Sequence, residues 1–273
     1  DAVLDTCWSE RSERVLCTAG GDGAVRLWNV GEPGVAPGGA APAAEWREHT
    51  GECCSVDWNK QDRDRVCSAS WDGSVKIWDS QAGCSIQDYR LNTQVVYAAA
   101  WSPLHSFLCA SVASVGGEGT LHVCDTRMSH PVQTVPVQSG ELLAMDWCKH
   151  SDDRIVTGGV DRAVKVWDRR SAAKPLMQLS GHTLAVTKVR FHPHTDTQLV
   201  SSSYDTTVMV WDLQRGHLVR CYQHHQEFAL GLDLNLFHEN LLATTSWDKS
   251  TCVFDWVRGP PAGNPWRPPQ AAL

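Results

Sequence analysis

The stretch Ser68–Asp79 (SASWDGSVKIWD) most constrains the fold, because it has the pattern of a β-hairpin that recurs along the chain. Asp72-Gly73 signals a tight turn, since glycine tolerates positive φ and aspartate can bond its own backbone. The residues after the turn alternate between small or polar and apolar side chains, as a half-buried strand does. One hairpin cannot bury its own apolar face, so its recurrence decides what it builds.

Five further copies of the hairpin close at positions 28, 124, 167, 211 and 254, compared with 78 for the first. The spacing of 43 to 50 residues is close to the period of a four-stranded propeller blade, about 40–45 residues. Each copy also has an upstream apolar segment, which we interpret as the innermost strand of its blade. The sequence thus resembles the WD40 repeat family over about residues 1–257, and the resemblance implies an all-β propeller.

Six blades are visible, and we expect them to belong to a seven-bladed ring. WD40 rings most often carry seven blades and this chain starts inside an inner strand, so we interpret it as a fragment without the first blade. Blade three departs most from the pattern, with Glu118 at the turn-aspartate position and Cys124 at the tryptophan position. Residues 31–42 are predicted to form a mobile insertion, and residues 258–273 a proline-rich disordered tail. The expected blades span residues 1–46, 49–91, 93–136, 139–179, 182–223 and 225–257.

Composition narrows the classes of function. The net charge is −7, with 24 basic and 31 acidic residues, and no run of lysine and arginine suggests a phosphate-binding surface. Nucleic-acid binding is therefore not expected, whereas a basic peptide is a suitable partner. The 11 cysteines lie largely in apolar strands without paired spacing, which indicates a reducing compartment. No apolar run is long enough to span a bilayer, so no direct membrane insertion is expected.

No catalytic, metal or cofactor site is predicted, and we expect a protein that is not an enzyme. In blade five, His182, Ser201–Ser203, Asp205 and Trp211 lie where WD40 blades use a His–Ser–Asp–Trp hydrogen-bond chain to lock their strands. Buried polar groups need partners, and repetition across blades favours a scaffold role. Two histidine pairs lack an acidic or thiolate third ligand and are weak metal candidates.

Two positions in each blade are predicted to lie on the rim of the central channel. One is the start of the inner strand and includes Glu52, Glu141 and Phe228. The other precedes the turn and includes Trp71, Tyr204 and Trp247. Exposed aromatic residues beside carboxylates are typical of a peptide-recognition patch, although any one ring could instead cover a neighbouring loop. The pattern favours a partner with both basic and leucine-like side chains, such as an amphipathic helix.

Several stretches resemble one family more closely than WD40 proteins at large. They are 48–58, 70–79, 145–149, 156–161, 181–186, 224–233 and 246–248. Together they resemble the peroxin-7 receptors for the type-2 peroxisomal targeting signal. That resemblance implies a receptor that binds an N-terminal amphipathic helix bearing Arg-Leu, a spacer and His-Leu. It also implies a co-receptor of the peroxin-5 or peroxin-20 class, contact with the peroxisomal docking machinery, and cycling between cytosol and peroxisome matrix.

The same resemblance assigns roles on the rim. Glu52 matches an acidic family position that faces the basic residue of the signal, and the aromatic residues Trp71, Tyr204 and Trp247 would accept its leucines. Further acidic candidates for peptide binding are Asp5, Glu141 and Glu227.

The alternative hypothesis for the function is a scaffold subunit of an assembly such as a ubiquitin ligase or a chromatin complex.

Overall fold

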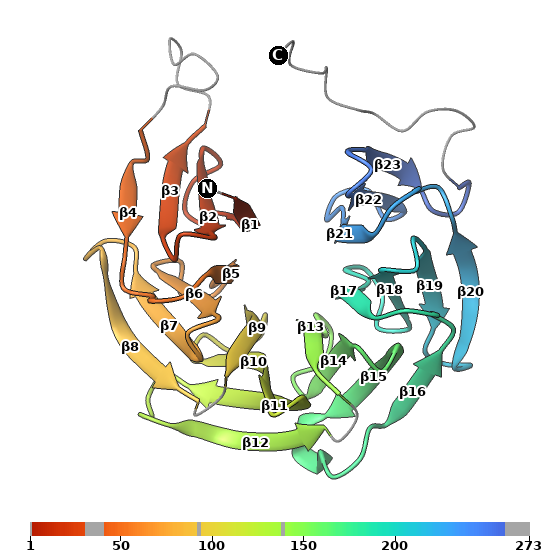
Figure 1. The fold of residues 1–273 in the computed structure, drawn as a ribbon, viewed down its shortest axis with the longest axis horizontal. Helices are drawn as coiled ribbons and strands as arrows, with labels where there is room; N and C mark the ends of the chain where they lie inside the picture. The colour runs from red at the N-terminus through yellow and green to blue at the C-terminus, as the bar shows by residue number, and fades with distance from the viewer. Residues whose placement is uncertain (1, 31–40, 92–93, 138–139, 260–273) are drawn as a thin grey trace. The chain divides into compact units, whose positions relative to one another are not determined.

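The computed structural model describes residues 2–30, 41–91, 94–137 and 140–259. It is built of antiparallel sheets and confirms the all-β prediction (Figure 1). The chain divides into two compact units, residues 1–142 and residues 143–273, called here the first and second unit. Most of the predicted insertion at 31–42, and the predicted tail from residue 260 on, lie outside the described residues.

The first unit contains three four-stranded sheets, each with its strands in sequence order. In Figure 1 the first strands of these sheets lie on one side of the unit and the fourth strands on the other. The sheets comprise β1 (Val3–Trp8), β2 (Val15–Gly20), β3 (Val25–Asn29) and β4 (Ala44–Trp46); β5 (Cys53–Trp58), β6 (Arg65–Ser70), β7 (Ser74–Asp79) and β8 (Cys84–Arg90); and β9 (Val95–Trp101), β10 (Leu108–Val115), β11 (Glu118–Asp125) and β12 (Pro131–Val137).

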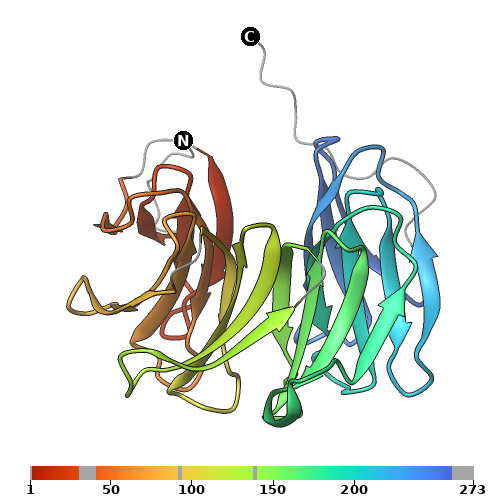
Figure 2. The same cartoon turned by 60° about the horizontal axis from the view of Figure 1, so that its bottom comes forward.

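The second unit repeats this plan with two four-stranded sheets and one sheet of three described strands. A single 3₁₀ turn, η1 (Arg169–Ser171), follows β15 and is the coiled ribbon of Figure 2. The sheets comprise β13 (Leu142–Trp147), β14 (Arg154–Gly159), β15 (Ala163–Asp168) and β16 (Met177–Ser180); β17 (Val186–Phe191), β18 (Gln198–Ser203), β19 (Val208–Asp212) and β20 (His217–Tyr222); and β21 (Ala229–Leu234), β22 (Leu241–Ser246) and β23 (Thr251–Asp255).

The hairpin turns require left-handed backbone, as the Asp-Gly signal predicts. Gly23 and Gly73 have φ of 77° and 81°, while Arg162, Thr206 and Lys249 at the matching turns have φ of 67°, 70° and 65°. An L-residue with a side chain is strained in this region, and glycine is not. The two units therefore make the same turn with different residues, and only the first uses the unstrained one.

Blade three corrects one interpretation of the sequence. Glu118 does not occupy the turn-aspartate position: it is the first residue of β11 and pairs with Val115. The turn consists of Gly116 and Gly117, both with positive φ, so β10 and β11 are longer than the matching strands of other blades. Two consecutive left-handed residues make the tight hairpin that glycine pairs favour.

The hydrophobic core of each unit lies between adjacent blades. The aromatic residue that closes an inner strand packs there: Trp58 is 3% exposed and Trp101 4%, and both belong to clusters shared with a neighbouring sheet. Trp8 at the matching place in β1 is 55% exposed. The adjacent Cys53 and Cys54 pack into two different clusters, so their side chains lie on opposite faces of β5.

Candidate peptide-binding site

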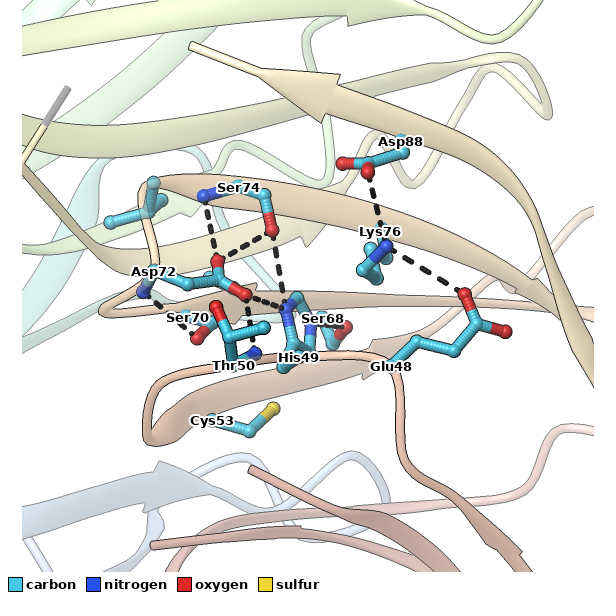
Figure 3. Close-up of polar contacts among 12 residues, drawn as sticks. Glu48, His49, Thr50, Cys53, Ser68, Ser70, Asp72, Ser74, Lys76 and Asp88 are labelled. Atoms are coloured by element: carbon cyan, nitrogen blue, oxygen red, sulfur yellow. Dashed lines mark hydrogen bonds and ion pairs between the residues drawn. The ribbon is translucent and has the colours of Figure 1, made fainter. Parts of the chain in front are cut away.

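A buried chain of hydrogen bonds links the strands of blade two (Figure 3). Trp78 Nε1 donates to Ser68 Oγ at 2.8 Å, Ser68 Oγ is 2.7 Å from His49 Nε2, and His49 Nδ1 is 2.9 Å from Asp72 Oδ2. If the His49 proton is on Nδ1, it is donated to Asp72, and Nε2 accepts the hydroxyl proton of Ser68. The same contacts recur in blade five among His182, Ser201, Asp205 and Trp211, so the predicted chain is confirmed there.

The protonation states of Asp72 and His49 favour a structural role for this hydrogen-bond chain over a catalytic one. Burial raises the pKa of Asp72, but hydrogen bonds from Ser74, Thr50 and His49 outweigh it and lower the pKa to about 2. Burial also lowers the pKa of His49, so the ring is neutral at pH 7. Ser68 is fully buried and its oxygen already accepts the indole N–H of Trp78. A Ser–His–Asp set in this state holds strands together and offers no accessible nucleophile.

The described residues contain no group of three or more His, Cys, Asp or Glu side chains that could hold a metal ion. In the same part of the chain, no helix is long and apolar enough to cross a membrane.

The two predicted rim positions of a blade are joined by a backbone hydrogen bond. In blade two, Trp71 N donates to Glu52 O at 2.9 Å, and in blade six Trp247 N donates to Phe228 O at 3.1 Å. Tyr204 N makes the same bond to Ala185 O in blade five. The hairpin residue and the start of the inner strand are therefore neighbours, so their side chains can form one local surface.

The first unit presents a cluster that combines aromatic rings with carboxylates. Trp71 is 46% exposed and meets Tyr97 edge-on, with 6.5 Å between ring centroids. Tyr97 Oη donates to Glu141 Oε2 at 3.1 Å, and Ser114 Oγ donates to Glu141 Oε1 at 3.3 Å. We call Trp71, Tyr97, Ser114 and Glu141 the first-unit cluster. Glu52 is exposed and joined to Trp71 through the backbone.

The second unit presents three aromatic rings in contact. Phe228 lies between Tyr204, at 4.8 Å between centroids, and Trp247, at 5.2 Å. Trp247 is 62% exposed, whereas Tyr204 and Phe228 are half-buried. We call Tyr204, Phe228 and Trp247 the second-unit cluster. Glu227 precedes Phe228 in the sequence and is exposed.

Asp5 has a structural contact that the sequence did not indicate. Its side chain is half-buried, and Oδ2 accepts a hydrogen bond from Val56 N at 3.2 Å, which links β1 to β5. Asp57 makes an analogous bond to Trp101 N at 2.7 Å in the next pair of blades. The part of Asp5 in peptide binding, like that of the other candidates, stays a prediction.

Tyr97 and Phe228 are the residues that sequence reasoning missed as site candidates. Phe228 already stood at a predicted rim position, so its aromatic type was an available signal. Tyr97 lies two residues beyond the rim position of its blade, and only its contacts with Trp71 and Glu141 reveal it. Those contacts join different blades and could not be derived from one repeat.

The WD domain, G-beta repeat family model matches residues 41–79, 129–168 and 173–212. The peroxisomal targeting signal 2 receptor of Mus musculus is 36% identical over 259 residues, covering 94% of this chain and 79% of the relative. Peroxisome biogenesis protein 7 of Arabidopsis thaliana is 39% identical over 260 residues, covering 95% and 79%. The Homo sapiens peroxisomal targeting signal 2 receptor is 35% identical over 234 residues, covering 85% and 70%. The WD40 β-propeller chain described here therefore belongs to the family of peroxisomal targeting signal 2 receptors.

Proposed function

We propose that this protein is a receptor for cargo proteins that carry the type-2 peroxisomal targeting signal. It binds the amphipathic signal helix in the cytosol, delivers the cargo with a co-receptor of the peroxin-5 or peroxin-20 class to the peroxisomal docking machinery, and cycles through the peroxisome matrix. Membership of the receptor family carries the proposal.

The two clusters supply the chemistry that such a helix needs. A helix with Arg-Leu and His-Leu pairs presents cationic and aliphatic side chains on neighbouring turns. In the first-unit cluster the Glu141 carboxylate is hydrogen-bonded to Tyr97, whose ring meets Trp71, and the second-unit cluster is aromatic. Partly exposed tryptophan and tyrosine often carry much of the binding free energy at interfaces.

The test is binding of a fluorescent Arg-Leu…His-Leu helix peptide to the purified chain, with and without the co-receptor, measured by anisotropy. Glu52→Lys should weaken binding at least tenfold, about 1.4 kcal/mol or more, without changing the unfolding midpoint. Glu13→Lys is the matched control, because it makes the same charge change at an exposed residue of the β1–β2 loop. Equal affinity of the Glu52→Lys and Glu13→Lys proteins would contradict the role of Glu52.

The alternative is a WD40 scaffold subunit of an assembly such as a ubiquitin ligase or a chromatin complex. Affinity purification discriminates the two functions. The receptor predicts peroxins and cargo in the eluate, and the alternative predicts the subunits of such an assembly with no peroxins.

A further inference from the structure

Glu141 immediately precedes β13, and both of its carboxylate oxygens accept hydrogen bonds from neutral donors. Tyr97 Oη donates to Oε2 at 3.1 Å and Ser114 Oγ donates to Oε1 at 3.3 Å. Tyr97 is in β9 and Ser114 is in β10, so two strands of one sheet fix the orientation of a side chain that comes from outside it. An ionised carboxylate accepts about four hydrogen bonds. One lone pair on each oxygen therefore remains available.

The charge of Glu141 is not neutralised from within the described part of the chain, where no lysine or arginine forms an ion pair with it. Other acidic residues contrast with it: Glu45 pairs with Arg26, and Asp79 pairs with Arg65. Glu141 is half-buried, so it has lost part of its hydration without gaining a countercharge. Such a carboxylate favours an incoming cation more than a fully solvated one does.

The surroundings of Glu141 fit an arginine better than a lysine. Two free lone pairs on two oriented oxygens match the planar fork of a guanidinium, which can donate to both at once. The Trp71 indole meets Tyr97 edge-on and is 46% exposed. An indole face can cover the alkyl stem of an arginine and interact with its charge.

Glu52 has a different character from Glu141. Its side chain is exposed and, in the described residues, accepts no hydrogen bond from another side chain. An exposed, solvated carboxylate attracts a basic peptide at long range but selects poorly between arginine and lysine.

We propose that Tyr97 and Ser114 are positioning residues that preset Glu141 as the acceptor for the arginine of the bound peptide, with Trp71 against its stem. Glu52 then contributes attraction and Glu141 contributes selectivity. This inference rests on the proposed receptor function and deepens it, because it assigns a side-chain class to one group of residues.

The experiment measures the affinity of two signal peptides, one with arginine and one with lysine at the basic position, in the presence of the co-receptor. The unaltered protein should bind the arginine peptide about tenfold more tightly, which is within the range for a charge-assisted bidentate contact. Glu141→Gln should reduce that ratio to near one. Tyr97→Phe, which keeps the ring and removes only the hydroxyl, should reduce it about threefold, and Ser114→Ala should act in the same direction.

The outcomes separate the two proposals. A purely structural role for Tyr97 would change the unfolding midpoint or weaken both peptides equally, leaving the ratio unchanged, and that result would overturn the inference. Binding of both peptides with the same arginine-to-lysine ratio in Glu141→Gln as in the unaltered protein would overturn it while sparing the receptor function. Binding of neither peptide by the unaltered protein would overturn both.

Discussion

The start of the inner strand carries a carboxylate in blades two and four and an aromatic ring in blade six. Glu52 and Glu141 are the carboxylates, and Phe228 is the ring. Blades two and six share one backbone hydrogen bond, in which the N–H of the hairpin tryptophan donates to the carbonyl oxygen at the start of the inner strand. The repeat thus fixes where a side chain stands, and one substitution per blade decides whether the surface is acidic or apolar.

This difference predicts that each cluster favours a different kind of peptide side chain, the first-unit cluster a cationic one and the second-unit cluster an aliphatic one. The largest expected effect is on the apolar side. Trp247→Ala should weaken peptide binding by about 2 kcal/mol or more, as truncation of an interface tryptophan often does, with little change in stability because the ring is 62% exposed. Phe237→Ala is the control, an 88% exposed ring on the β21–β22 loop at the other end of the same sheet. Isothermal titration that gives equal losses for both variants would remove the second-unit cluster from the site.

The hydrogen-bond chain of blade two should affect stability and leave peptide recognition unchanged. Ser68→Ala leaves His49 Nε2 and Trp78 Nε1 without partners, and should lower the free energy of unfolding by about 1–3 kcal/mol. Ser111→Ala is a matched control, because Ser111 is equally buried but its hydroxyl has no hydrogen-bond partner in the described residues. Its expected effect is within about 0.5 kcal/mol. Urea denaturation that shows the same loss in both variants would refute the scaffold role of Ser68.

A dependence on pH should arise in each unit from histidines whose pKa is lowered by burial, and His122 and His224 are examples. Burial lowers the pKa of His122 to about 4; burial and the nearby His225 lower the pKa of His224 to about 4. The folded pKa is below the unfolded value of about 6.5, so the unfolded chain binds more protons between these values. Stability should therefore be full above pH 6.5 and fall toward pH 4.

The measurement is the free energy of unfolding from pH 7.5 to 4.5, with His122→Gln and His224→Gln as comparisons. Each variant should reduce the slope against pH by its own contribution. Slopes as steep as that of the unaltered protein in both variants would mean that other groups cause the acid sensitivity.

The smallest effect concerns the hairpin turns, where the two units differ most plainly. Thr206 adopts φ of 70°, at the turn place that Gly73 holds at 81°. Thr206→Gly should stabilise the second unit by up to about 1 kcal/mol, because it relieves left-handed strain on a β-branched residue. Gly73→Thr should destabilise the first unit. A lower unfolding midpoint for Thr206→Gly would show that the entropy of the added glycine outweighs the strain.

The sequence was informative wherever one blade contains the whole signal. The Asp72-Gly73 turn and the exposure of Trp71 and Trp247 follow from a single repeat, and the structure has them as predicted. The bond from Asp5 to Val56 and the contact of Tyr97 with Glu141 join residues about 44 to 51 positions apart. They depend on how blades pack, which a local pattern does not encode.

Blade three shows a second limit of prediction from the sequence, besides the contacts between blades. Its glycine-rich turn offered several places for the two left-handed residues, and strand length decided between them. The register, with Val115 opposite Glu118, follows from the whole β10–β11 pairing. The interpretation of Glu118 as a turn residue was wrong because it extended the pattern of neighbouring blades to a longer hairpin.

The most direct test of the account is a double-mutant cycle between protein and peptide. Glu141→Gln and Trp247→Ala are each combined with peptides in which the arginine or a leucine is replaced by alanine. The account predicts coupling of about 1 kcal/mol or more between Glu141 and the arginine, and between Trp247 and a leucine, with near-additive behaviour in the crossed pairs. Strong coupling in the crossed pairs, or none in any pair, would contradict the division of the two clusters between charge and apolar contact.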